Sequence, residues 1–465
     1  MRKKMVIIGA GSAMFTQGLV ADLIQSPDQQ SWTLGLVDID PVALETAEGL
    51  SRKMVEFKGA DILIEASIDR RDVLPGADVV VITIGVGKRK AWEQDVFIPR
   101  QFGVYQPVGD TAMPGGISRA MRMIPALLDI ARDVKALCPD AWFFNYSNPM
   151  AANCSAIWQA TGIPVVGLCH GTFHVQRELA ALLGAPAEEI SSIAVGLNHL
   201  TFFTDLRWQG RDAWPLLRDK VAAVLHGAEK DAGFPQAGDL FAEEMTIGCN
   251  PFSWTLFEAY GAYPAANDRH VTEFFPERFP GGQYYGKILG KDAYSFEDII
   301  TLGDEIYDEM RAQATGAAPL DERIFERSIG EHEQLLDILA SIERDDRRVF
   351  YANLPNQGAV PNLPDDAILE MPTVATAGGL RPIQIHDYPD PLAAVITQKI
   401  STIRVTVEAA LTGSRELLVE AMLLDGAVTD QAVAEEMVAA LLEAQRDYLP
   451  NFFQVEQSGS TEHSQ

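Results

Sequence analysis

The chain of 465 residues is poor in two features that define large classes of protein. It has only four cysteines and no Cys-x-x-Cys pair, which argues against the disulfide framework of a secreted protein and favours a reducing compartment. Its start, MRKKMVIIGAG, has too few apolar residues before the glycines for a signal sequence or a membrane span. We therefore expect a cytoplasmic protein that has no membrane partner.

Positive charge is also scarce. Asp and Glu number 65 against 37 Lys and Arg, which gives a formal net charge of −28. Such a surface repels a phosphate backbone, so we expect no nucleic-acid partner. Apolar residues make up 47% of the chain and charged residues 22%, which is typical of a soluble globular protein. Because the chain is too long for one ordinary core, two domains are expected.

The amino-terminal segment MVIIGAGSAMFTQGLVADLI predicts a nucleotide site. An apolar strand, Met5–Ile8, leads through Gly9 and Gly11 into an amphipathic helix. Glycines there let the backbone approach a pyrophosphate, and the free N–H groups of the helix start attract it. The G-x-G-x-x-G pattern is incomplete because Met14 replaces the third glycine. An α/β domain with tight turns and no nucleotide is the alternative.

Three further strands support the nucleotide site. The segment WTLGLVDID ends in Asp38, about 27 residues after Gly11, where a carboxylate can accept hydrogen bonds from the adenosine ribose and favours NAD over NADP. The segments ADVVVITIGVG and AWFFNYSNPM indicate two more buried strands whose ends carry glycine or polar residues. We predict an α/β fold: a Rossmann-like domain over residues 1–198, a mixed α+β domain over 199–455 with the architecture of lactate and malate dehydrogenases, and a flexible tail over 456–465.

Basic residues lie near the expected ligand edge of this sheet. Lys88, Arg89 and Lys90 follow a strand directly, and Arg119 and Arg122 lie one turn apart on a helix that follows GDTAMPGGIS. A run of charges is usually a solvated loop. Its place at the strand end nevertheless makes it a candidate for binding a substrate anion. Either helix arginine is also consistent with a plain surface charge.

The segment VVGLCHGTFH places Cys169 and His170 at the end of another buried strand. Neighbouring strand residues point to opposite faces, which disfavours a nucleophile with an adjacent base. The segment SSIAVGLNHLTFF puts His199 at the end of the next strand, from which it can meet Cys169 across the crevice. One thiolate and one imidazole suit a catalytic divalent ion that also holds substrate oxygens. The alternative is a small core cysteine with a structural histidine.

Taken together, six motifs resemble glycoside hydrolase family 4, the NAD- and divalent-metal-dependent glycosidases. IGAGSAMF, VDID, GDTAMPGGIS, NYSNPM, GLCHG and GLNH occur in the order and at about the spacing of that family, over residues 5 to about 280. The resemblance implies oxidation of the sugar at C3 by NAD, removal of the C2 proton, metal-assisted elimination of the glycosidic oxygen, addition of water and return of the hydride. These enzymes are exceptions to two-carboxylate hydrolysis.

The resemblance also implies a set of site residues. Cys169 and His199 match the metal ligands, for which we expect Mn²⁺ or another divalent ion. Asn148 matches the residue that binds the sugar near C2 and C3. His170 stands where phospho-sugar members carry Asp or Asn, and that Asp is held to be their general acid, so His170 is our candidate for the general acid and for a substrate contact. The implied cofactor contacts are Gly9, Gly11, Ser12, Ala13, Met14, Asp38, Asn145 and Asn148.

The C2 base is expected in the segment EAYGAYPAANDRHVTEFFP, which offers Tyr260, Tyr263, Asp268 and His270. Each can accept a proton once its surroundings tune its pKa. Tyr263 and Asp268 rank first. The other residues of the group then have packing or capping roles.

The motif from the metal cysteine onward, CHGT, resembles the CHG-x members that act on α-glucuronides and α-galacturonides. A uronate needs a cation, for which arginine is well suited, and Arg89, Arg119 and Arg269 are the candidates. Hydrolysis of neutral α-glucosides or α-galactosides is the alternative within the family. A 2-hydroxy-acid dehydrogenase and a non-catalytic NAD sensor are alternatives from other classes. We expect a homodimer or homotetramer that binds a small sugar substrate.

Overall fold

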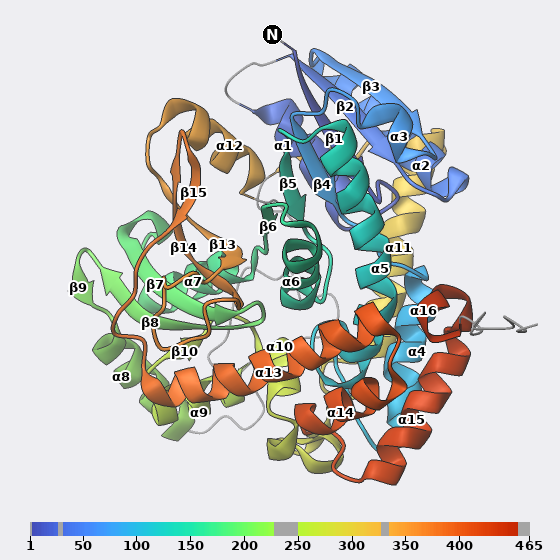
Figure 1. The fold of residues 1–465 in the computed structure, drawn as a ribbon. Coiled ribbons are helices and arrows are strands. Elements are labelled where there is room, and N and C mark those ends of the chain that lie inside the picture. The colour runs from blue at the N-terminus through green and yellow to red at the C-terminus, as the bar shows by residue number, and fades with distance from the viewer. Residues whose placement is uncertain (1, 27–30, 227–249, 327–333, 454–465) are drawn as a thin grey trace, which may run out of the picture.

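One mixed β-sheet runs through the molecule (Figure 1). The structure is a computed structural model that describes residues 2–26, 31–226, 250–326 and 334–453. The sheet strands are β1 (Lys3–Ile8), β2 (Trp32–Val37), β3 (Ile62–Ser67), β4 (Val79–Ile82), β5 (Trp142–Asn145), β6 (Val165–Gly167), β7 (Ile190–Leu197), β8 (Leu200–Trp208), β9 (Arg211–Asp212), β10 (Tyr263–Pro264), β13 (Val349–Pro355), β14 (Ile368–Thr376) and β15 (Gly379–Pro382). Their order is β10-β8-β7-β14-β13-β6-β5-β4-β1-β2-β3, with β15 beside β14 and β9 beside β8.

The amino-terminal half is a parallel sheet covered on both faces. Strands β3, β2, β1, β4, β5 and β6 pair in parallel. Val6 and Ile8 of β1 pack into one buried apolar cluster, whereas Met5 and Ile7 pack into another on the opposite face. The connecting helices are α1 (Phe15–Gln25), α2 (Pro41–Lys58), α3 (Arg70–Val73), α4 (Lys88–Gln101), α5 (Met113–Leu137), α6 (Met150–Thr161) and α7 (Gly171–Leu183). This arrangement confirms the predicted Rossmann-like α/β fold.

The second half of the chain extends the same sheet. Strands β7 and β8 form an antiparallel hairpin, and the expected domain boundary at residues 198 and 199 falls in its turn, so the sheet continues across that point. Strands β13 and β14 form a second hairpin that lies between β6 and β7. The segment LPNQGAVPNLPDDAILEMPTVATAGGLRPIQI contributes the end of β13, β14 and β15 to this sheet.

Helices of the second half surround this extension. They are α8 (Trp214–His226), α9 (Pro251–Tyr260), α10 (Asp268–Val271), α11 (Phe296–Thr315), α12 (Leu335–Arg344), α13 (Asp390–Thr412), α14 (Arg415–Asp425), α15 (Gln431–Ala444) and α16 (Pro450–Phe453), with a separate hairpin of β11 (Gln283–Tyr284) and β12 (Lys287–Ile288). Helix α13 crosses α5 and packs on α14, which produces a third apolar cluster (Figure 1). Within the described ranges, no helix has the length and apolar character to cross a bilayer.

Two sequence features lie outside the described residues: Cys249 and the tail over 456–465. The cysteines that the structure does describe, Cys138, Cys154 and Cys169, form no disulfide with one another. This agrees with the prediction from sequence that the chain carries no disulfide framework.

Candidate active site

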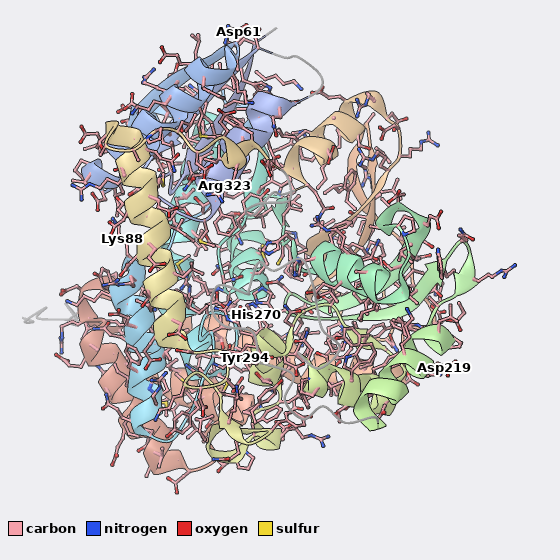
Figure 2. The ribbon with its side chains drawn as sticks, turned by 180° about the vertical axis from the view of Figure 1, so that it is seen from behind. Asp61, Lys88, Asp219, His270, Tyr294 and Arg323 are labelled. Carbon is pink, nitrogen blue, oxygen red and sulfur yellow. The ribbon has the colours of Figure 1, made fainter. Side chains whose placement is uncertain are left out.

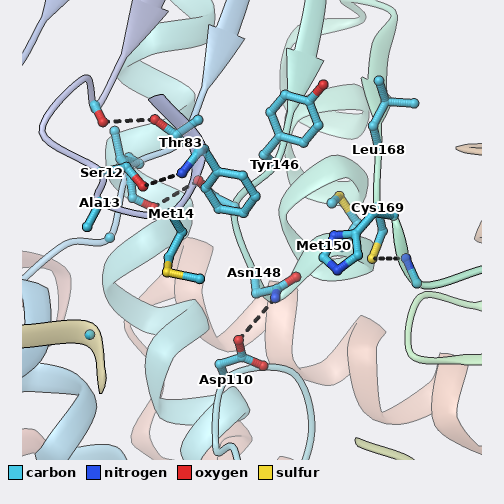
Figure 3. Close-up of a pocket in the computed structure, with 18 of the residues that line it drawn as sticks. Ser12, Ala13, Met14, Thr83, Asp110, Tyr146, Asn148, Met150, Leu168 and Cys169 are labelled. Atoms are coloured by element: carbon cyan, nitrogen blue, oxygen red, sulfur yellow. Dashed lines mark hydrogen bonds between the residues drawn. The ribbon is translucent and has the colours of Figure 1, made fainter. Parts of the chain in front are cut away.

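A cavity of about 2230 Å³ opens where the parallel strands end. Ser12, Ala13 and Met14 lie on one side of it and Cys169 lies on the other, with Asn148 between them (Figure 3). The sequence placed these residues at the carboxyl ends of separate strands. Because parallel strands end at one edge of a sheet, the fold brings those ends into one crevice.

The glycine turn forms one end of the cavity. Gly9 has a φ of +99°, and a Cβ at this position would lie 2.8 Å from the backbone nitrogen of Ile84, so only glycine fits without strain. The Gly11 N–H donates to Asp38 Oδ2 at 2.9 Å, and the Asp40 N–H donates to the other oxygen of Asp38 at 2.9 Å. The glycine turn and the acid at the end of β2 are therefore joined by a direct hydrogen bond at this end of the cavity.

Asn148 and Asn145 differ in their placement. The Asn148 side chain lines the cavity, where its Nδ2 donates to Asp110 Oδ2 at 3.0 Å, and its carbonyl accepts from Arg119 Nε at 3.1 Å (Figure 3). Asn145 is fully buried in β5, and its Nδ2 donates to the Ser147 carbonyl at 2.9 Å. The structure therefore corrects the prediction for Asn145: this side chain holds the turn that carries Asn148.

Cys169 and His199 meet at the other end of the cavity. Cys169 follows β6, His199 lies in the β7–β8 turn with a φ of 68°, and Cys169 Sγ is 3.8 Å from His199 Nε2. A thiolate and an imidazole on one tetrahedral ion would be about 3.6 Å apart, from metal–ligand distances of about 2.3 and 2.1 Å. Thr111 Oγ1 lies 3.0 Å from His199 Nδ1 and orients the ring.

The protonation of His199 also fits a metal ligand. Burial lowers its pKa to about 4, so the imidazole is neutral at neutral pH and its lone pair is available. The ligand atoms of His199, Asp110 and His270 lie within 4.8 Å of one another, so they form a further candidate donor group. The sequence quoted Asp110 only as part of GDTAMPGGIS, and its role as a possible donor was missed.

The structure reverses the ranking of the base candidates. Tyr263, in β10, is 1% exposed and packs against Trp254 with ring centroids 4.5 Å apart and the ring planes tilted by 53°, and burial raises its pKa well above the usual value. Asp268 is fully buried, accepts from the N–H groups of Phe252 and Ser253 at 2.7 and 2.8 Å, and so holds the start of α9. Tyr263 and Asp268 therefore make packing and capping contacts, and neither is among the residues that line the cavity.

His270 is the candidate that lines the cavity. Its ring centroid is 4.1 Å from that of His199, and burial lowers its pKa well below the usual value, which keeps the imidazole neutral. Tyr260, the fourth candidate, packs edge-on against Phe202. Tyr294, which was not a candidate from sequence, lines the same cavity as His270; Figure 2 labels both.

The basic residues separate into three groups. The Lys88–Lys90 run forms the first turn of α4 and not a loop, and there Lys88 pairs with Asp40 while Arg89 pairs with Asp304 at the cavity rim. Arg119, Arg269 and His170 line the cavity. Arg122 is buried in an ion pair and so is no surface charge. Of the three arginines expected near a uronate, Arg119 and Arg269 face the interior of the site.

Two family models together match most of this chain. Residues 4–185 match the model of family 4 glycosyl hydrolase, and residues 194–428 match the model of the family 4 glycosyl hydrolase C-terminal domain. The chain belongs to this family. An α-glucosidase from Erwinia rhapontici is 31% identical, covering 97% of this chain and 99% of that protein. An α-galacturonidase from Bacillus subtilis is 30% identical, covering 95% and 97%.

Solved structures agree on the fold. A 6-phospho-α-glucosidase from gut microorganisms in complex with NAD and Mn²⁺ superposes with a TM-score of 0.82 at 19% identity, covering 97% of this chain and 99% of that chain. The family resemblance drawn from the six sequence motifs is confirmed. Membership of this family favours a glycosidase over the dehydrogenase and the NAD sensor considered from sequence.

Proposed function

We propose that the protein is a glycosidase that binds NAD and a divalent ion such as Mn²⁺ and cleaves α-linked uronides. The observation that carries the proposal is a cavity that the glycine turn with Asp38 lines at one end and the Cys169–His199 pair at the other, with Asn148 between them (Figure 3). When bound, NAD supplies the hydride chemistry and the metal supplies a Lewis acid for the sugar oxygens.

The protein's own residues have separable tasks in this proposal. Cys169 and His199 would hold the metal ion. The amide of Asn148, held by Asp110, would bind the sugar hydroxyls. His270, neutral and facing the cavity, is the proton acceptor that the geometry favours for C2. His170, next to Cys169 in the cavity wall, would deliver a proton to the leaving oxygen.

Arg269 supports the choice of a uronate. It lines the cavity directly before His270, and its positive charge contributes to lowering the pKa values of His270 and His199. A guanidinium in that position can bind a C6 carboxylate with two parallel hydrogen bonds. Arg89 lies at the rim and pairs with Asp304, which makes it the weaker candidate. Neutral α-glucosides or α-galactosides are the alternative substrates.

The proposal is tested by release of p-nitrophenol from its α-glucuronide, α-galacturonide, α-glucoside and α-galactoside, with NAD and Mn²⁺ each supplied or withheld. We expect cleavage of a uronide that stops when either is removed. Arg269→Gln should lower kcat/KM for the uronide by about 30-fold or more, because the carboxylate loses a partner in a desolvated site. The neutral glycosides should change much less.

Arg89→Gln is the matched control for Arg269→Gln, because it removes an arginine from the exposed rim of the same cavity. It should leave uronide cleavage nearly unchanged. An equal decrease of kcat/KM for uronides and neutral glycosides in Arg269→Gln would show that Arg269 does not bind the carboxylate. Preference of the wild-type protein for a neutral glycoside would overturn the uronide assignment and leave the family activity intact.

His270→Ala should slow exchange of the sugar C2 proton with deuterated solvent by about 100- to 10,000-fold, the range for a lost general base. Mass spectrometry of the sugar measures the deuterium taken up. His386→Ala removes an exposed histidine elsewhere and should leave exchange unchanged. Unaltered exchange in His270→Ala would assign the base to another residue.

A further inference from the structure

The two proposed metal ligands lie at the ends of strands that are not neighbours. The hairpin β13–β14, more than 150 residues further along the chain, separates β6 from β7 (Figure 1). One row of paired residues crosses all four strands: Gly167 of β6 opposite Asn353, Asn353 opposite Glu370, and Glu370 opposite Gly196 of β7. Glu370 therefore lies in the row that connects the two ligand-bearing strands.

The Glu370 carboxylate contacts both ligand segments directly. Its Oε1 accepts from Thr172 Oγ1 at 2.5 Å, and its Oε2 accepts from Asn198 Nδ2 at 3.0 Å. Thr172 is three residues after Cys169, and Asn198 is immediately before His199. The carboxylate thus joins the segment of one ligand to the segment of the other.

A carboxyl group buried in this position destabilises the fold unless hydrogen bonds offset its desolvation. Glu370 is 2% exposed, and burial raises its pKa. An apolar side chain would fill the same space without the desolvation cost, whereas the acid is stable there only because its oxygens accept hydrogen bonds. Buried polar networks of this kind rigidify the elements they join.

We propose that Glu370 is a positioning residue for the metal pair: through Thr172 and Asn198 it sets the separation of Cys169 Sγ and His199 Nε2 before any ion binds. The inference rests on the metal part of the proposed function. It also assigns a structural task to the fourth residue of CHGT, because the Thr172 hydroxyl points to Glu370. Removal of a group that orients metal-ligating residues typically weakens metal binding by about 10- to 100-fold.

The test measures Mn²⁺ affinity of the whole protein by the paramagnetic resonance signal of free Mn²⁺. Glu370→Gln removes the negative charge and replaces one acceptor oxygen by an NH₂ group, which cannot accept a hydrogen bond from Thr172 or Asn198. Thr172→Val removes the hydroxyl that donates to Glu370 and leaves the side-chain volume nearly unchanged. We expect each variant to bind Mn²⁺ about 10- to 100-fold more weakly. Thr172→Ser keeps the hydroxyl and should restore the affinity.

Two controls separate positioning from general damage. NAD affinity should stay unchanged in every variant, because the glycine turn lies at the other end of the cavity. Glu178→Gln alters another buried glutamate, on α7, which pairs with His174 at 3.1 Å, and should leave Mn²⁺ affinity unchanged. The Co²⁺-loaded protein gives a second readout, because its thiolate-to-cobalt absorption should weaken in Glu370→Gln.

The outcomes are distinct. No Mn²⁺ binding by the wild-type protein would overturn the metal part of the proposed function itself. Wild-type binding with unaltered affinity in Glu370→Gln and Thr172→Val would overturn only the role of Glu370. Parallel losses of Mn²⁺ and NAD affinity would also overturn it, because they indicate a general structural role. If Glu370→Gln does not fold, the Thr172→Val and Thr172→Ser pair decides the question.

Discussion

Cys169→Ala is expected to lower kcat/KM for the glycoside by about 1000-fold or more. The substitution leaves one imidazole, that of His199, on the proposed ion, and Lewis-acid catalysis supplies several kcal/mol of stabilisation to the developing charge. Release of p-nitrophenol and the Mn²⁺ content of the purified protein measure the effect together. Both should fall, while NAD affinity should stay at the wild-type value.

Cys138→Ala is the matched control for the loss of a thiol. Cys138 is 5% exposed, follows α5 in an apolar cluster, and has a pKa that burial raises to about 11, so it is an inert core residue. Its replacement should leave both activity and metal content nearly unchanged. Full activity in Cys169→Ala would refute the metal site and leave Cys169 with only a packing role.

Arg122→Met is expected to reduce the free energy of unfolding by about 3–5 kcal/mol, the usual result of removing one partner of a buried ion pair. Arg122 is 2% exposed, and its Nη1 and Nη2 donate to the two oxygens of Asp95 at 2.9 and 2.5 Å. Its Nη1 also reaches Gln445 Oε1 at 2.9 Å, and its Nε donates to the Val86 carbonyl at 2.8 Å. The substitution leaves Asp95 buried without its cation, as urea denaturation followed by tryptophan fluorescence should show.

The control lies on the same helix. Arg132 pairs with Asp129 at 2.7 Å, but these side chains are 64% and 65% exposed. Arg132→Met should therefore cost no more than about 1 kcal/mol, since solvent screens an exposed pair. Similar stability losses in the two variants would indicate that the buried network around Arg122 contributes nothing special to the fold.

Local sequence patterns were sufficient to predict the glycine turn and the acid that follows the next strand. A strand, Gly9, Gly11 and a following helix make a turn whose shape depends on a few successive residues, and Asp38 follows the next strand at a regular distance. Local patterns also placed Cys169 and His199, because each residue directly follows an apolar run that predicts a strand. The motifs together also identified the family.

Local sequence patterns did not show which of the base candidates faces the cavity. Tyr263, Asp268 and His270 stand within eight residues of one another and are all chemically suitable. Only the packing of β10 on β8 and the contacts of Asp268 with α9 turn two of them away from the cavity. No periodicity in so short an irregular segment specifies which side chain faces a crevice.

By itself, then, the sequence determined the α/β class and the family, and it predicted the glycine turn and the Cys169–His199 pair, because strand periodicity, turn chemistry and motif order act over short stretches of chain. The tertiary structure alone decided that Glu370 joins the two ligand segments, that Arg122 is a buried ion-pair partner, and that His270 faces the cavity. These facts depend on sheet register and helix packing between residues far apart in the chain. Such long-range contacts have no signature in the residues immediately around them.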